Sequence, residues 1–177
     1  MPKRARRIAL GVTGSIAAFK APALVRGLVK KGAEVRCVLT PSAAHFITPL
    51  TLAALSRHPL ASSMHDPELW EMAHLSLASW ADLVLIAPAT ADIIARLAQG
   101  RAEGLLDALV LSTRAPIAVC PAMDADMWDH PATRANVKTL ARHGYQVWGP
   151  AKGELASGKI GFGRMLEPDE IVRRALK

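Results

Sequence analysis

A strand, a glycine turn and a helical pattern open the sequence, and this unit constrains the fold more than any other. An apolar run starts at Ile8 and meets the turn 11–15, Gly-Val-Thr-Gly-Ser. Apolar residues then recur at helical spacing to about Lys31. Gly14 lets a ligand approach the backbone, and Ser15 occupies the place of an N-cap. Such a turn either binds an anion or simply connects two elements, since its G-x-x-G-S spacing is neither a dinucleotide fingerprint nor a Walker loop.

Strand-like apolar runs alternate with helical patterns along the rest of the chain. We expect further strands at 34–40, 83–87, 116–120 and 146–148, and helices at 50–55, 93–100, 104–111, 130–143 and 168–176. The run 83–87 is apolar on both faces, which is typical of a central parallel strand. The pattern predicts an α/β fold, a doubly wound parallel sheet of the Rossmann-like three-layer type, in a single domain over residues 1–177.

The loops that follow the predicted strands differ from the connections at the opposite end. Segments 11–15, 40–42, 88–92 and 121–128 are rich in Gly, Ser, Thr, Pro or Asp, whereas the other connections are plain. Ligands of open parallel sheets bind beyond the carboxyl ends of the strands. The sequence therefore predicts a binding site at this edge.

Composition narrows the function classes. Lys and Arg outnumber Asp and Glu by 22 to 15, and the net charge of +7 suits an anionic small molecule. Basic residues are scattered and aromatic residues are few, so we expect no nucleic-acid partner. No run is long and uncharged enough for a membrane span, and we expect no secretory signal. Cys37 and Cys120 lie in apolar strand-like runs, which predicts buried, reduced thiols and a cytoplasmic protein.

Four segments together resemble a known family. They are GVTGSIAAFKA (11–21), APATADIIARLAQG (87–100), PAMDADMWDHPAT (121–133) and GELASGKIGFGRMLEP (153–168). They resemble the flavin-dependent cysteine decarboxylases, and most closely the branch that acts on phosphopantothenoylcysteine in coenzyme A synthesis. The resemblance covers nearly the whole chain. It implies an FMN-dependent carboxy-lyase that converts 4'-phosphopantothenoylcysteine to 4'-phosphopantetheine, with FMN reversibly oxidising the thiol-bearing carbon.

The resemblance also assigns roles to individual residues. It implies FMN contacts at Gly14, Ser15, Ile16, Thr40, Ser42, Ala89, Thr90, Ala91, Asp92 and Ala122. It places the catalytic base at His74 and the proton donor of the reductive step at Ser157. Substrate contacts are implied at Asp124, Met127, Glu154, Ala156 and Lys159, and no metal is implied. The remaining histidines are expected at the surface: His45, His58, His65, His130 and His143.

Two positions depart from the family pattern. Asp124 stands where the family usually has asparagine, and an ionised aspartate only accepts hydrogen bonds. It either faces the substrate, with a cation such as Lys159 between the two carboxylates, or caps a short helix over 125–128. Ser157 stands where many members have cysteine, and serine is a far weaker acid than a thiol of pKa ~8.5. The segment 153–163 around Ser157 is either a substrate-covering flap or a disordered glycine-rich tail.

The family's assembly and its relatives supply further expectations. The resemblance implies a homotrimer or homododecamer with sites between subunits, in which the helix 49–55 is an interface candidate, and a ligase domain or protein acting upstream. Three alternatives remain: a peptidyl-cysteine decarboxylase that releases an enethiol, a flavin prenyltransferase, and a non-catalytic flavin-binding regulatory subunit. GRMLEP and the net charge favour the phosphorylated substrate over a peptide. A prenyltransferase is expected to lack PAMxxxMW, and the regulatory subunits carry long acidic tails that this sequence lacks.

Overall fold

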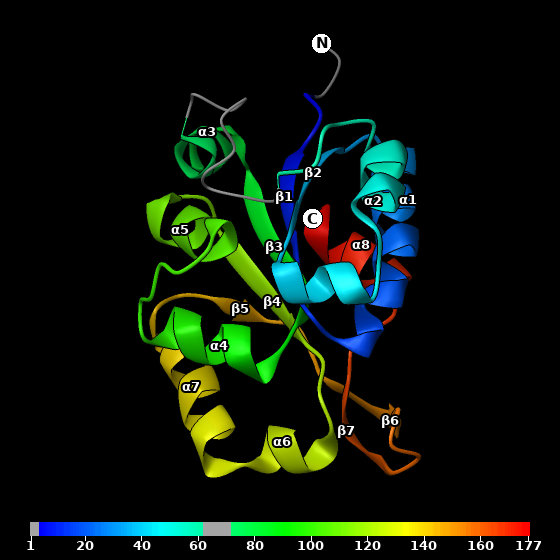
Figure 1. The fold of residues 1–177 in the computed structure, drawn as a ribbon, viewed down its shortest axis with the longest axis vertical. Coiled ribbons are helices and arrows are strands. Elements are labelled where there is room, and N and C mark those ends of the chain that lie inside the picture. The colour runs from blue at the N-terminus through cyan, green and yellow to red at the C-terminus, as the bar shows by residue number, and fades with distance from the viewer. Residues whose placement is uncertain (1–3, 62–71) are drawn as a thin grey trace.

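A single parallel sheet forms the centre of the molecule (Figure 1). The computed structural model describes residues 4–61 and 72–177. Within them, five strands pair in the order β2-β1-β3-β4-β5. Their bounds are β1 (Arg7–Val12), β2 (Glu34–Leu39), β3 (Leu83–Ala89), β4 (Ile117–Pro121) and β5 (Gln146–Val147). Each strand predicted from the apolar runs is present, and the doubly wound parallel sheet is confirmed.

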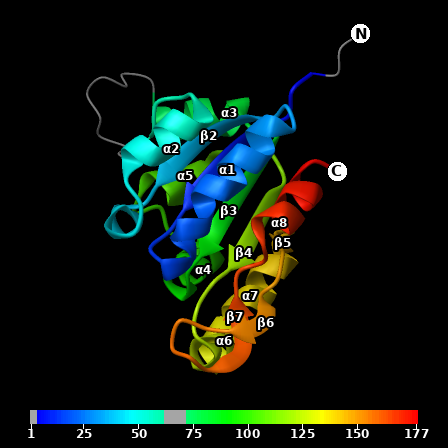
Figure 2. The ribbon, with the colours of Figure 1, turned by 90° about the vertical axis from the view of Figure 1, so that its right-hand side faces the viewer.

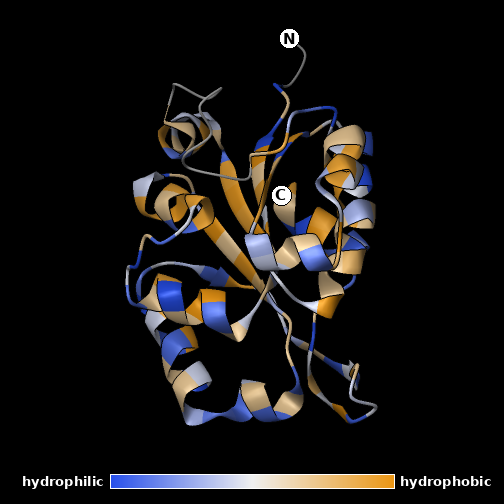
Figure 3. Ribbon diagram, viewed as in Figure 1, coloured by the Kyte–Doolittle hydropathy of each residue, from blue (hydrophilic) through white to orange (hydrophobic). Residues whose placement is uncertain are grey.

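Helices cover both faces of the sheet, which gives the predicted three layers (Figure 2). One face carries α1 (Ala21–Lys30), α2 (Pro49–Ser56) and α8 (Pro168–Ala175). The other carries α3 (Ala73–Trp80), α4 (Ala91–Ala98), α5 (Leu105–Ser112) and α7 (Pro131–Arg142). Figure 3 shows apolar residues along the strands and on the helices that cover them, and Leu50 of α2 and Leu111 of α5 are exposed.

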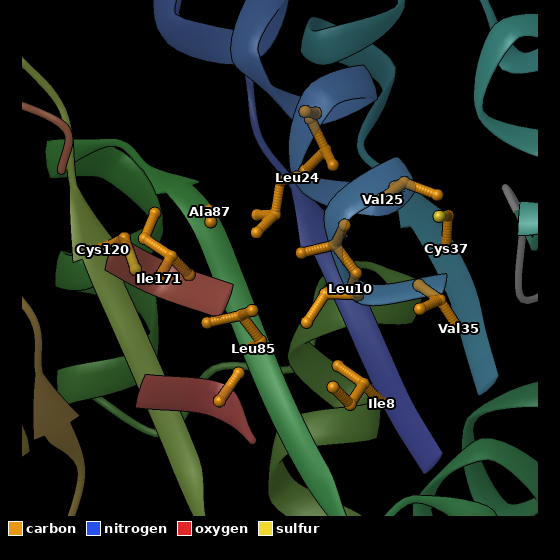
Figure 4. Close-up of a cluster of buried hydrophobic side chains, with 14 of the residues drawn as sticks. Ile8, Leu10, Leu24, Val25, Val35, Cys37, Leu85, Ala87, Cys120 and Ile171 are labelled. Atoms are coloured by element: carbon orange, nitrogen blue, oxygen red, sulfur yellow. The ribbon is translucent and has the colours of Figure 1, made fainter. Parts of the chain in front are cut away.

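Alternation along the strands divides the core between the two faces. Ile8 and Leu10 of β1 pack with Leu24 of α1 and Ile171 of α8, and all four are fully buried (Figure 4). Ala9, between them in sequence, belongs to the core on the other face. Successive strand residues point to opposite faces, so a central strand must be apolar throughout, as the sequence predicted.

The two cysteines lie inside this core, as expected. Both thiols are free and buried. Burial raises the pKa of Cys37 to about 12, and it also raises the pKa of Cys120. Both therefore stay protonated at neutral pH and behave as small apolar residues.

The helix after the glycine turn is interrupted, which the sequence pattern did not predict. A 3-10 turn, η1 (Ile16–Lys20), precedes α1. Pro22 lies in the first turn of α1 and has no N–H to donate to Ala18 four residues earlier. The N–H of Ala21 bonds to the Ala18 carbonyl instead, so the chain winds tightly here before α1 begins.

The glycine-rich segment 153–163 is ordered in the structure. The strands β6 (Ala151–Glu154) and β7 (Ile160–Arg164) form an antiparallel hairpin, so the alternative of a disordered tail is wrong. The N–H of Met123, after β4, donates to the Gly163 carbonyl at 3.0 Å. A Cβ at Gly163 would overlap the Met123 carbonyl oxygen. Glycine at this position therefore lets the hairpin lie directly against the β4 loop.

Smaller elements complete the fold. The turn after β2 is the 3-10 helix η2 (Pro41–His45), and α6 (Ala125–Asp129) follows the β4 loop. His65, expected at the surface, lies outside the described residues. His58 lies partly exposed at the surface, with Nε2 3.6 Å from Glu34 Oε1. No helix within 4–61 and 72–177 has the length and apolar character of a membrane span.

Candidate active site

Two adjoining cavities lie at the edge that the loop composition predicted. They have volumes of about 420 and 740 Å³ and share Ser15, Ala122 and Met123 as lining residues. The strand order reverses at β1, whose neighbours are β2 and β3. Such a reversal opens a crevice between the loops that leave the strands, and this is where open α/β sheets bind ligands.

The smaller cavity collects most of the residues predicted to contact the cofactor. Its lining is Thr13, Gly14, Ser15, Thr40, Ser42, Thr90, Ala91, Asp92, Arg96, Ala122, Met123 and Met127. Thr90 caps α4 by accepting the Ile93 N–H at 3.2 Å. Thr13 Oγ1 donates to the Pro88 carbonyl at 2.7 Å and accepts the Thr90 N–H at 3.2 Å. Thr13, which the sequence analysis did not single out, therefore joins the first loop to the third.

The chemistry of this cavity fits a phosphate ester with a hydroxylated chain. Thr40 Oγ1 is buried without a hydrogen-bond partner among the described residues, so it is available to a ligand. The first loop and η2 approach so closely that a Cβ at Gly14 would lie 2.5 Å from Ser42 Cβ. Hydroxyls and the amino end of α4 meet here, and helix amino ends favour anions.

One cation faces the same cavity. Arg96 Nη1 lies 2.8 Å from Asp107 Oδ2, and its Nε lies 3.1 Å from Asp92 Oδ2. Asp107 is 1% exposed, and its desolvation raises its pKa even though Arg96 opposes the shift. Asp107 thus fixes the Arg96 guanidinium. The sequence analysis missed Arg96 because its helical spacing resembles that of any solvated helix residue.

The larger cavity lies between η1 and the β6–β7 hairpin. It is lined by Ser15, Ile16, Ala17, Phe19, Lys20, Ala122, Met123, Asp124, Glu154, Leu155, Ala156, Ser157, Gly163, Arg164 and Met165. Apolar walls with a few charged groups suit an organic ligand. The structure brings the predicted residues Asp124, Glu154, Ala156 and Ser157 together here, although Ser157 and Asp124 are 33 positions apart.

Asp124 and Ser157 form a pair that the sequence analysis did not foresee. Asp124 Oδ1 accepts the Asp126 N–H at 3.2 Å, which confirms that Asp124 caps α6. Its Oδ2 accepts the Ser157 hydroxyl at 2.5 Å. These two bonds, first that from Ser157, lower the pKa of Asp124. Asp124 is therefore an ionised acceptor at neutral pH, with both carboxylate oxygens engaged.

Lys159 does not stand between Asp124 and the cavity. Its Nζ lies 2.5 Å from Asp126 Oδ2, and this contact raises the pKa of Lys159. The residue lines neither cavity. The ion pair joins the hairpin tip to α6, a contact between distant segments that sequence spacing cannot predict.

His74 and Ala89 are the other predicted site residues outside both linings. Ala89 is fully buried at the end of β3. His74 lies in the first turn of α3, the helix that precedes β3 (Figure 1), whereas the cavities are lined by loops that follow the strands. The described residues of one chain therefore do not bring His74 into the site.

A Rossmann-like α/β fold with a polar cavity at its switch point is typical of proteins that bind nucleotide cofactors. The sequence profile of the family described as Flavoprotein matches residues 1–177. The chain belongs to this family.

The relatives agree with this membership. Proteins named coenzyme A biosynthesis bifunctional protein CoaBC are 52% identical over 168 residues in Vibrio cholerae and 49% identical over 172 residues in Escherichia coli K12. The alignments cover 94% and 97% of this chain but 42% of each relative. The chain thus spans less than half the length of those proteins.

Solved structures share the fold. A PPC decarboxylase cysteine-to-serine mutant complexed with pantothenoylaminoethenethiol is 32% identical, with a TM-score of 0.90 over 98% of this chain and 97% of that one. The FMN binding protein AtHal3 is also 32% identical, with a TM-score of 0.87 over 98% and 96% of the two chains.

Proposed function

We propose that the chain binds FMN, with the phosphate and the hydroxylated chain of the cofactor in the smaller cavity. The observation that carries this proposal is the buried Thr40 hydroxyl, which has no hydrogen-bond partner in the described part of the chain, beside the close approach of Gly14 to Ser42. Gly14, Ser15, Ser42 and Thr90 would supply the remaining donors. Ile16 and Ala122 would provide apolar contacts at the junction with the larger cavity.

We further propose the decarboxylation of 4'-phosphopantothenoylcysteine to 4'-phosphopantetheine in the larger cavity. The names of the half-identical relatives and of the PPC decarboxylase structure support this substrate. They favour it over a peptidyl substrate and over a non-catalytic regulatory role. Bound FMN supplies reversible oxidation of the thiol-bearing carbon. The chain's own residues orient the substrate, exclude water beneath the hairpin and hold protons at Ser157 and His74.

The position of His74 leads to a proposal about assembly. We infer a homo-oligomer, a trimer or a dodecamer built from trimers, in which α3 of a neighbouring copy brings His74 to the cavities. The sequence neighbours Met72 and Leu75 are 63% and 46% exposed, and Phe19 at the larger cavity is 63% exposed. Large exposed apolar side chains of this kind are typical of interfaces. His74 would then accept a substrate proton near neutral pH.

The source of the substrate is also part of the proposal. The CoaBC relatives are bifunctional by name and more than twice as long as this chain. We propose that a ligase, fused or separate, forms the cysteine amide that this domain consumes. The buried thiols Cys37 and Cys120 favour a reducing, cytoplasmic setting.

The test uses protein loaded with FMN. Incubation with 4'-phosphopantothenoylcysteine should yield a product lighter by one carbon dioxide, read by mass spectrometry. A matched variant, Gly14→Val, should be purified without flavin absorbance, because its side chain would occupy the space held by Ser42. Protein that holds FMN and leaves the substrate unchanged would overturn the proposed activity. Protein that takes up FAD and not FMN would overturn the proposed cofactor.

A further inference from the structure

Two cations that line the larger cavity, Lys20 and Arg164, share one carboxylate outside the lining. Lys20 Nζ lies 2.9 Å from Glu167 Oε1 and 3.4 Å from the Met165 carbonyl oxygen. Arg164 Nη2 lies 2.8 Å from the same Glu167 oxygen. Glu167 is ionised, since the Lys20 contact, above all, lowers its pKa. One carboxylate thus holds two cations, and one positive charge is left over.

The cations face the cavity and the carboxylate does not. Lys20 and Arg164 belong to the cavity lining, whereas Glu167 does not. The other charged side chains of that lining, among the described residues, are the acids Asp124 and Glu154. An anionic group entering this cavity is therefore attracted to the Lys20–Arg164 wall and repelled from the acidic residues.

Lys20 is buried at this wall, and Arg164 is about half exposed and held by its ion pair with Glu167. Lys20 is 9% exposed, and its ammonium position is fixed by the Glu167 and Met165 contacts. The Arg164 side chain lies across Gly153 on the neighbouring strand, where a Cβ would come within 3.1 Å of its Cδ. Glycine at position 153 thus leaves room for the arginine beside the cavity. A fixed guanidinium and a fixed ammonium suit a phosphate dianion.

We propose that Lys20 and Arg164 form the subsite for the phosphate of the substrate and set the preference for a phosphorylated over an unphosphorylated one. This inference rests on the proposed function. Ser157 lies at the hairpin tip and Arg164 at the base of β7. Four strand steps from Ile160 to Arg164 cover about 13 Å at ~3.3 Å per residue. That length accommodates an extended arm between the reacting end of a substrate and its phosphate.

The test compares phosphorylated and unphosphorylated ligands on FMN-loaded protein. Arg164→Gln should lower kcat/KM for 4'-phosphopantothenoylcysteine roughly ten- to a hundredfold and leave kcat/KM for pantothenoylcysteine within about twofold. Lys20→Met should act in the same direction. The matched control is Arg174→Gln, because Arg174 forms a similar exposed ion pair with Glu170 at 2.7 Å on α8. The control should change neither value.

Binding supplies a readout that does not depend on turnover. Calorimetry should show that the wild type binds 4'-phosphopantetheine more tightly than pantetheine, and that Arg164→Gln removes this difference. Neither ligand has the cysteine carboxylate, so the result isolates the phosphate. Equal losses for both ligands, or no loss in Arg164→Gln, would overturn the subsite. A wild type that converts neither substrate yet binds the two ligands with the predicted difference would refute the proposed function and leave the subsite standing. If Lys20→Met does not fold, Arg164→Gln decides the question.

Discussion

At the scale of single residues, the hydrogen bond from Ser157 to Asp124 bears on which group donates the proton of the proposed reductive step. The resemblance implies an asparagine and a cysteine at these two positions, whereas this chain has a carboxylate that accepts a hydrogen bond from a hydroxyl. An ionised carboxylate can only accept, so Ser157 is committed as a donor to Asp124. In the proposed reductive step, either a water or another acid donates the proton to the substrate, or the Ser157 hydroxyl turns from Asp124 to the substrate.

Replacing the hydroxyl by a stronger acid should accelerate one step alone. In Ser157→Cys, delivery of the proton to carbon should become roughly tenfold faster or more, because general acids of suitable pKa contribute strongly to rate. Release of carbon dioxide should keep its rate, since that step needs no acid at position 157. Rapid-quench mass spectrometry under anaerobic conditions separates the two rates. An unchanged second rate would mean that Ser157 is not the donor site.

Asp82 gives a residue-scale prediction about stability. Its pKa falls from 3.8 to about 2, first because of the Arg7 guanidinium and then because of the Arg7 N–H. A carboxyl whose pKa is depressed by folding stabilises the protein above its unfolded-state pKa, and this effect disappears as pH falls through the folded-state value. The full shift is worth at most about 2.5 kcal/mol, and we expect about 1 kcal/mol because the side chain is 34% exposed.

Asp82→Asn should therefore lower the free energy of unfolding by about 1 kcal/mol at pH 7. The gap between wild type and variant should shrink as pH falls from 5 toward 2. Urea denaturation at several pH values measures it. A gap that stays constant across this range would show that the charge of Asp82 contributes nothing.

At the scale of elements, the β6–β7 hairpin is held at its tip and near its end. The tip contacts α6 through Ser157 and Lys159, and Gly163 bonds to Met123 in the β4 loop. The tip contacts are exposed, and exposed ion pairs stabilise little. The tip should therefore open more readily than the rest of the hairpin, which is what a lid over a substrate requires.

Lys159→Met tests this account of the hairpin. Amide hydrogen exchange over 155–160 should become faster and KM should rise, while the melting temperature changes little. Lys152→Met is the control, because Lys152 is an exposed residue of the same hairpin that lines neither cavity. Unchanged exchange in Lys159→Met would mean that the ion pair with Asp126 does not hold the tip.

Sequence predicts well the elements whose cause is local. The apolar run 83–87 must be a buried strand wherever it lies, and Thr90 caps the helix that follows it. The 3-10 turn before α1 also has a local cause, Pro22, but the spacing of apolar residues does not reveal that one N–H is missing. The hairpin could not be predicted in this way, because the need for glycine at position 163 arises from its contact with Met123, a residue distant in sequence. Lys20 was missed for the same reason, since its partner Glu167 lies 147 positions away.

At the scale of the whole molecule, His74 and the two cavities do not meet within one copy, since His74 lines neither cavity. A single copy therefore offers a cofactor and substrate site without its proposed base. This arrangement supports the proposal that sites form between copies. Sites of that kind allow subunits with different mutations to complement one another, which sites within one chain do not.

Two inactive variants should restore activity when their subunits mix. His74→Asn keeps the cavities and lacks the base, whereas Gly14→Val keeps His74 and loses the cofactor cradle. Hybrids assembled at equal ratio should have roughly a quarter of their sites intact if partners assort at random. Turnover measured after co-refolding reads this fraction. A mixture as inactive as its components would contradict a site shared between copies.

One anaerobic turnover of the FMN-loaded protein with 4'-phosphopantothenoylcysteine tests the proposed function most directly. Product mass and flavin absorbance are followed in the same sample. We expect carbon dioxide to be lost first and saturated 4'-phosphopantetheine to form more slowly, with the flavin absorbance returning to its starting value. Accumulation of the enethiol with lasting loss of flavin absorbance, or a substrate that keeps its carboxyl group, would contradict the function proposed for this chain.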